Sequence, residues 1–140
     1  MKRLGMIAVL LLICIAFPTT LNAGTVNNQG KAWLDAQKDP AAINVDGTWN
    51  SDEFADLHLS QDAGSRDVSG VGAGYRLTGV VNGKRLYLLF TSGRTVEYCA
   101  VLTSGSGNSL VGSYSSKVSR LEFGAGLCQE KSRPMYMSKK

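Results

Sequence analysis

The sequence predicts an all-β protein: an antiparallel up-and-down meander that closes into a small barrel of seven or eight strands, preceded by a short helix. Three observations support this fold class. Apolar and polar residues alternate with a period of two through most of residues 53–123. Turn sequences rich in Gly, Ser and Asn separate these runs at short intervals. No helical pattern lies between the runs, so hairpins rather than crossovers connect neighbouring strands.

Length and composition fit one compact domain and limit the classes of function. The 140 residues are 44% hydrophobic and 19% charged, with 16 Gly and 3 Pro, which excludes collagen, low-complexity disorder and a polytopic membrane protein. The chain has a single His and no phosphate-loop or zinc-ligand spacing. We therefore expect a protein that is not an enzyme and has no metal site and no cofactor.

Residues 1–23 have the pattern of a signal peptide. Two basic residues precede an apolar run over residues 4–17, which is shorter than the about 20 residues that a membrane-spanning helix needs. The small residue Ala23 suits cleavage before Gly24. The alternatives are an uncleaved anchor helix and a lipid on Cys14, although a bulky residue precedes that cysteine. We expect export to the periplasm or the extracellular space, with no membrane span after cleavage.

The charge of the cleaved chain is small but uneven. Residues 24–67 carry a net charge of −5, and residues 68–140 carry a net charge of +7. This balance in an exported chain argues against nucleic acid as a partner. Solvated charges on opposite sides of one domain are the simpler interpretation.

Two cysteines, Cys99 and Cys128, remain after cleavage. An even pair in an oxidising compartment predicts one disulfide. Closing a loop of about 30 residues in this way stabilises the fold by about 3–4 kcal/mol in the chain-entropy model.

The N-terminal segment, residues 24–46, is expected to hold one short helix over residues 31–38, which ends before a proline. Residues 24–30 are polar and are expected to be loose. Two helical turns are not stable alone, so Trp33 and Leu34 must dock on the main body, for example at one of its ends.

The barrel domain is assigned to residues 47–124. Alternation predicts strands over residues 53–61, 66–71 and 75–81, and a further strand around residues 118–123. Residues beyond this domain, 125–140, are expected to form a strap or tail.

Turn chemistry predicts the strand registers. Asn82-Gly83 is the strongest hairpin signal, because both residues tolerate a positive φ. Loops over residues 92–94 and 104–108 complete the next two hairpins. The pairs that keep the apolar faces together are Leu77 with Leu88, Leu88 with Tyr98, and Tyr98 with Tyr114.

One face of these strands is expected to form the interior. Its large side chains are Leu57, Leu59, Tyr75, Leu77, Leu86, Leu88, Phe90, Tyr98, Leu102 and Tyr114. An eight-stranded barrel is either filled by such side chains or holds one small ligand. The adjacent small residues Gly79, Ala100 and Gly112 leave room for a pocket, unless large side chains opposite fill it. If a ligand binds, we expect contacts with Tyr75, Tyr98, Tyr114, Leu88 and Phe90, because buried hydroxyls need partners.

The opposite face also carries apolar residues, namely Tyr87, Leu89, Cys99, Val101 and Val111. Soluble monomers rarely leave such a patch bare. The predicted disulfide would bring residues 125–140 across it as a strap. The alternative is a homodimer or partner interface on the same patch.

An enzymatic site has one weak candidate. Asp56 and His58 lie two residues apart on one polar strand face, with Glu53 nearby. Further metal ligands are not evident, and no nucleophile stands beside a second base. A solvated strand face is the simpler interpretation.

The segment Gly47-Thr48-Trp49-Asn50 at the start of the meander resembles the opening of calycin barrels, that is, the lipocalins and the avidin-like proteins. The resemblance covers about residues 47–123 and depends on the Gly-x-Trp motif. It implies that Trp49 closes one end of the barrel and that Arg120 stacks over the indole ring. It does not imply biotin binding, because avidin-like sites use Trp residues on later strands, and none follows Trp49. The alternative is a separate family of small exported bacterial barrels that shares only the architecture.

These observations predict an exported, non-catalytic β-barrel binding module for a small apolar ligand. The alternative is a structural or protein–protein interaction module of the cell envelope, including a small secreted inhibitor. The sequence identifies neither the ligand nor a protein partner.

Overall fold

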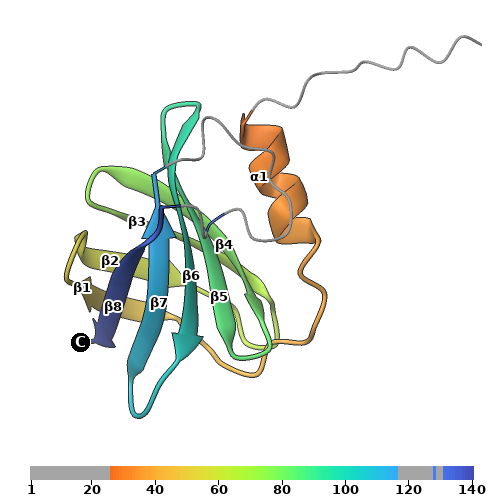
Figure 1. Ribbon diagram of the computed structural model, residues 1–140. Helices are drawn as coiled ribbons and strands as arrows, with labels where there is room; N and C mark the ends of the chain where they lie inside the picture. Colours follow the sequence, from red (N-terminus) through yellow and green to blue (C-terminus); the bar gives the residue numbers. More distant parts are fainter. Residues whose placement is uncertain (1–25, 117–127, 129–130) are drawn as a thin grey trace, which may run out of the picture.

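The computed structural model describes residues 26–116, 128 and 131–140. Eight strands form one closed barrel, in which each strand pairs antiparallel with the next and β8 pairs with β1 (Figure 1). The strands are β1 (Gly47–Ser51), β2 (Ala55–Ser60), β3 (Asp67–Gly72), β4 (Tyr75–Asn82), β5 (Arg85–Ser92), β6 (Thr95–Ser104), β7 (Ser109–Ser115) and β8 (Arg133–Lys139). The predicted fold class is confirmed. The predicted signal peptide and the strand expected over residues 118–123 lie outside the described residues.

The helix α1 (Val26–Asp35) begins within the segment expected to be loose and ends before the predicted boundary. Gly30 lies inside this helix, although glycine disfavours helical structure. A Cβ atom at Gly30 would lie 2.7 Å from Cδ1 of Leu89, so glycine allows α1 to approach the barrel wall closely. The helix lies against the outside of the wall rather than at an end of the barrel (Figure 1). Tertiary packing, which the local sequence does not reveal, therefore extends the helix.

The barrel interior is a single buried cluster. All ten side chains predicted to face inward belong to it or pack against it, together with Trp49, Phe54, Met135 and Met137. The period-two pattern thus assigned the two faces of the strands correctly.

The registers predicted from the turns were wrong by two residues in each of three hairpins. The observed pairs are Leu77 with Phe90, Phe90 with Tyr98, and Ala100 with Tyr114. A slip of two residues keeps every side chain on its own face, so the hydrophobic pattern does not distinguish the alternatives. In the β4–β5 turn, Asn82 pairs with Arg85 and its Oδ1 accepts the N–H of Asp39 at 2.6 Å. This contact with a distant segment favours the observed register.

A bulge interrupts the pairing of β5 and β6. Phe90 pairs with Tyr98 but Thr91 pairs with Val96, so Glu97 is the extra residue. The bulge shortens the predicted loop to two residues. It also turns Val96 to the outside of the barrel, where it joins the cluster beneath α1.

The C-terminal residues 133–139 form a strand and not the predicted strap. β8 pairs with β7 on one side and with β1 on the other. Met135 and Met137 point into the core, whereas Tyr136 points outward and is 48% exposed. A seven-stranded sheet would leave two edges with unpaired backbone groups, and β8 satisfies both. The alternation in Met135-Tyr136-Met137 was the signal for this strand.

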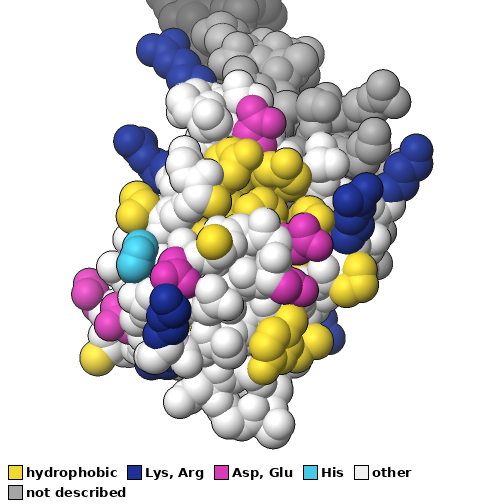
Figure 2. Space-filling model, turned by 90° about the vertical axis from the view of Figure 1, so that its left-hand side faces the viewer, with side chains coloured by type: hydrophobic (Ala, Val, Ile, Leu, Met, Phe, Trp, Pro, Cys, Tyr) yellow, Lys and Arg dark blue, Asp and Glu magenta, His cyan; other side chains and the backbone are white. Residues whose placement is uncertain are grey.

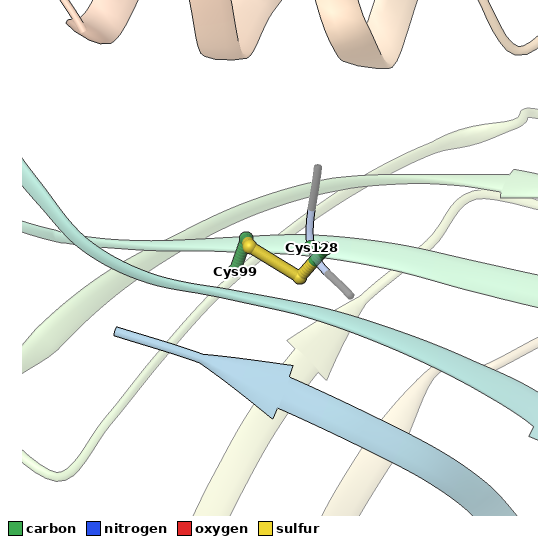
Figure 3. Close-up of a disulfide and its surroundings, with 2 residues drawn as sticks. All are labelled: Cys99 and Cys128. Atoms are coloured by element: carbon green, nitrogen blue, oxygen red, sulfur yellow. A yellow bond between two sulfur atoms is a disulfide. The ribbon is translucent and has the colours of Figure 1, made fainter. Parts of the chain in front are cut away.

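A second buried cluster lies between α1 and the outer faces of β4, β5 and β6. Its members are Trp33, Leu34, Val80, Tyr87, Leu89, Val96, Cys99 and Cys128. Cys99 and Cys128 form the predicted disulfide, with Cα atoms 5.8 Å apart (Figure 3). The cover of the outer patch is therefore the N-terminal helix together with Cys128. Val111 lies beyond this cover and remains 50% exposed.

Candidate ligand-binding end of the barrel

The hairpin turns alternate between the two ends of the barrel, which we name by their contents. The Trp49 end holds the turns β2–β3, β4–β5 and β6–β7. The aromatic end holds the turns β1–β2, β3–β4 and β5–β6, and the side chains Phe54, Tyr75, Phe90, Tyr98 and Tyr114. The aromatic end is uppermost in Figures 1 and 2.

The Trp49 end is closed by a hydrogen-bonded plug. The indole Nε1–H of Trp49 donates to the carbonyl of Val45 at 2.8 Å. The buried Gln61 side chain accepts from the Val45 N–H at 2.7 Å and donates to the Ser65 carbonyl at 2.8 Å. The Nζ of Lys139 lies 5.9 Å from the centre of the Trp49 ring. A cation from β8 therefore occupies the position that the resemblance assigned to Arg120, a residue outside the described ones.

Five aromatic rings meet at the aromatic end. They come from five segments, since Phe54 belongs to the β1–β2 turn and the others belong to β4, β5, β6 and β7. The Phe54 ring stacks on Phe90 with centroids 4.5 Å apart. It meets Tyr98 and Tyr114 edge-on at 5.2 Å each, and Tyr75 at 6.4 Å. Such pairs add about 0.5–1.5 kcal/mol each beyond area burial.

The residues predicted to contact a ligand do not all lie together. Tyr75, Phe90, Tyr98 and Tyr114 share the ring cluster. Leu88 precedes Phe90 by two residues on the same face, so it lies one layer deeper, fully buried.

Phe54 was not predicted to face inward, because it is out of phase with the apolar positions of the strand expected over residues 53–61. In the structure it lies in the polar turn between β1 and β2. Its N–H donates to Oγ of the buried Ser51 at 2.8 Å, and the Ser51 hydroxyl donates to the Ala55 carbonyl at 3.1 Å. An isolated aromatic residue in the turn Ser-Asp-Glu-Phe was the signal available.

The proposed pocket beside the small residues is absent from this part of the interior. Gly79 and Ala100 both pair with Leu88, and Gly112 pairs with Leu102, so the small residues are not adjacent. A Cβ atom on Gly79 would lie 2.7 Å from Cδ2 of Leu88. The Leu88 side chain therefore fills the space over this glycine, as close packing requires.

A hollow of about 210 Å³ lies beside the rings at the aromatic end. Its lining residues are Glu53, Phe54, Tyr98, Tyr114, Ser116, Lys131 and Arg133. Figure 2 shows hydrophobic side chains gathered in the upper part of this face, with acidic and basic side chains around them. Tyr75 and Tyr98 are only partly buried, so their rings remain accessible here.

Two tyrosine hydroxyls at this end take part in hydrogen bonds. Burial raises the pKa of Tyr114 above its ordinary value of 10.0, and a hydrogen bond to Glu53 raises this pKa further, while Arg133 opposes the shift. Burial also raises the pKa of Tyr75, together with its hydrogen-bonded neighbour Tyr98. Both hydroxyls therefore remain protonated at neutral pH, and their oxygens can accept a hydrogen bond from a ligand.

A larger groove of about 760 Å³ lies outside the barrel, between α1 and strands β3, β4 and β5. Leu34, Val80, Leu89 and Val96 line its apolar part. Arg66, at its rim, donates to the Gln37 carbonyl at 2.7 Å and so fastens the segment that follows the helix. No sequence pattern predicted this groove, because local sequence does not reveal on which wall the helix docks.

The acidic and histidine residues considered for catalysis are engaged in separate contacts. His58 Nδ1 lies 3.0 Å from Thr48 Oγ1. The Asp56 carboxylate accepts from Asn50 and from Lys140, which lowers the pKa of Asp56. Glu53 instead lies beside Tyr114 at the aromatic end. Among residues 26–116, 128 and 131–140, no group of three or more His, Cys, Asp or Glu residues could hold a metal ion.

Comparison with known proteins identifies no relative of this chain. No family model, no curated protein and no solved structure matches this chain. Within the part of the chain that the structure describes, no helix has the length and apolar character needed to cross a membrane. The chemistry of the candidate site is therefore inferred from its own residues.

Proposed function

We propose that this chain is an exported, non-catalytic binding module that holds a small apolar ligand at the aromatic end of its barrel. The observation that supports the proposal is the convergence of five rings from five segments beside a hollow. Aromatic side chains that stay partly accessible next to polar groups are typical of ligand sites. The disulfide agrees with export, because such bonds persist in oxidising compartments.

The packed interior supports a ligand position at the rim rather than in the centre of the barrel. Leu88, Phe90, Ala100 and Leu102 have no exposed surface. A ligand ring would instead lie against Tyr98 and Phe54, with its polar groups toward the Tyr75 and Tyr114 hydroxyls. The expected affinity is modest, since a small ligand at a rim keeps part of its surface in water.

Fluorescence titration with the neutral apolar probe N-phenyl-1-naphthylamine tests the proposal. Tyr98→Ala should weaken binding about tenfold or more, because it removes a ring face from the site. Tyr136→Ala is the matched control: it removes a half-exposed tyrosine from the outer wall of β8 and should leave the affinity unchanged. Equal affinity in the wild type and in Tyr98→Ala would refute the proposal.

The groove beside α1 is the competing location for the same probe. Thr78→Arg introduces a long side chain at the groove lining, on the outer face of β4, whereas the aromatic rings lie on the inner side of the barrel. Loss of binding in Thr78→Arg but not in Tyr98→Ala would move the site to the groove.

Protein–protein interaction remains a second candidate because of one pair of residues. Val111 and Tyr136 face each other on the outer wall of β7 and β8, and both are about half exposed. If this pair forms an interface, the mass in solution should rise with protein concentration, and Tyr136→Ser should abolish that rise. A mass independent of concentration would contradict self-association.

A further inference from the structure

We propose that the ligand of the aromatic end is an organic anion, whose apolar body lies on the rings and whose carboxylate or sulfonate binds Arg133 and Lys131. This inference builds on the proposed function and names the chemical class of the ligand.

The position of Arg133 carries the argument. Every second residue of β8 pairs with an inward-facing position of β7. These residues are Met137, Met135 and Arg133. Arg133 pairs with Tyr114, a member of the ring cluster. The row of core side chains thus ends in a guanidinium group at the aromatic end. An apolar side chain would continue the core there, so a charged one indicates a different role.

Lys131 adds a second cation to the same hollow. It adopts a φ of +49°, an uncommon conformation for a residue with a side chain. The salt bridge seen in the described part of the chain joins Lys140 to Asp56, on the outer face of β1 and β2. Neither Lys131 nor Arg133 therefore has a carboxylate partner among the described residues. Arginine binds carboxylates and related anions through two parallel hydrogen bonds.

One carboxylate in the lining opposes an anion. Glu53 lies in the hollow, where it accepts a hydrogen bond from the Tyr114 hydroxyl. Two cations and one carboxylate leave a net positive charge in the lining. The Arg133 guanidinium hydrogen-bonds the Tyr114 hydroxyl in the same network. A guanidinium carries five N–H donors, so this one contact leaves others for an anion.

Two fluorescent probes that differ by a single group test the inference. 1-Anilinonaphthalene-8-sulfonate carries a sulfonate that N-phenyl-1-naphthylamine lacks, and the two share the same apolar body. At low salt the anionic probe should bind the disulfide-bonded chain about tenfold more tightly than the neutral one. Added salt should lower the affinity for the anionic probe and leave the affinity for the neutral probe unchanged.

Charge-removing variants locate the effect. Lys131→Gln with Arg133→Gln should abolish the preference for the anionic probe, with no change for the neutral probe. The matched control changes two basic residues at the other end, Lys84→Gln with Arg85→Gln, and should keep the preference. Glu53→Gln should raise the affinity for the anionic probe severalfold, because it removes a negative charge from the hollow. Since Lys131 is exposed, Lys131→Gln alone gives a partial loss even if the double variant folds poorly.

The outcomes separate this inference from the proposed function. Equal affinities of the two probes, or a preference that survives the double variant, would overturn the anion inference while Tyr98→Ala still weakens both probes. If neither probe responds to Tyr98→Ala, the proposed function fails together with the inference.

Discussion

The two ends of the barrel are closed by different chemistry. At the Trp49 end, one indole and one buried glutamine make directed hydrogen bonds to Val45 in the loop before β1 and to Ser65 in the β2–β3 turn. At the aromatic end, rings pack against one another while hydroxyls and charges remain at the surface. A hydrogen-bonded plug tolerates little rearrangement, because a broken bond leaves a buried polar group unpaired. Contacts between aromatic rings lose less free energy when the rings shift, because they are less directional than hydrogen bonds. The aromatic end is therefore better suited to accept a ligand.

Removing the ring that closes each end should give the largest difference. Trp49→Ala should cost about 3–5 kcal/mol of unfolding free energy, because it leaves a cavity in the core. Tyr98→Ala should cost about 1–2 kcal/mol, since this ring is only partly buried. Urea denaturation followed by circular dichroism measures both values. Equal costs would contradict the assignment of one end to stability and the other to binding.

Loss of the disulfide should have the next largest effect on stability, and this effect should be concentrated at the aromatic end. Cys128 lies between β7 and β8 in the chain, and its sulfur is bonded to Cys99 of β6 (Figure 3). Replacing both cysteines by alanine should lower stability by about 3–4 kcal/mol in the chain-entropy model. Amide hydrogen exchange should then rise in β8 near Arg133 more than around Trp49. Uniform exchange over both ends would contradict this local role.

Alkaline titration should show the effect of burial on Tyr75 and Tyr114. Burial raises the pKa values of both, so they should ionise at a higher pH in the folded protein than in the unfolded chain. Because the folded-state pKa exceeds the unfolded one, stability is intact below pH 10.0 and falls as the pH rises through the folded values. Absorbance of tyrosinate at 295 nm, recorded for Tyr75→Phe, Tyr114→Phe and the wild type, measures the two ionisations. Loss of a step at or below pH 10.0 in either variant would contradict the raised pKa values.

The smallest effect is expected from the ion pair near the C-terminus. Asn50 and Lys140 lower the pKa of Asp56, so its contribution is present at neutral pH and is lost as the pH falls below about 3.8. Asp56→Asn should change stability only slightly, since both partners are solvated. The measurable sign is a weaker decline of stability in acid than in the wild type. An unchanged acid profile would show that the pair does not stabilise the strand end.

Much of the fold was predictable from local pattern. Alternation placed Leu77, Leu88 and Tyr98 on the inner face, and cysteine pairing predicted the disulfide. The candidate site was predictable in part: three tyrosines and Phe90 meet, but Phe54 and Arg133 were not anticipated. Phe54 falls on the polar side of the alternation in the strand predicted over residues 53–61, and Arg133 falls in the segment predicted to be a strap. The periodicity therefore marks neither residue as inward-facing.

The local pattern of residues is sufficient to assign each strand side chain to a face, because a period of two leaves no other choice once one face is buried. Long-range packing sets how far each strand is shifted along its neighbour, where the helix docks and which segment closes the barrel. A shift of two residues leaves every side chain on the same face. The structural roles of Gly30, Asn82, Met135 and Met137 depend on contacts with segments that are distant in the sequence. Those contacts join residues far apart in the chain, and local composition carries no record of them.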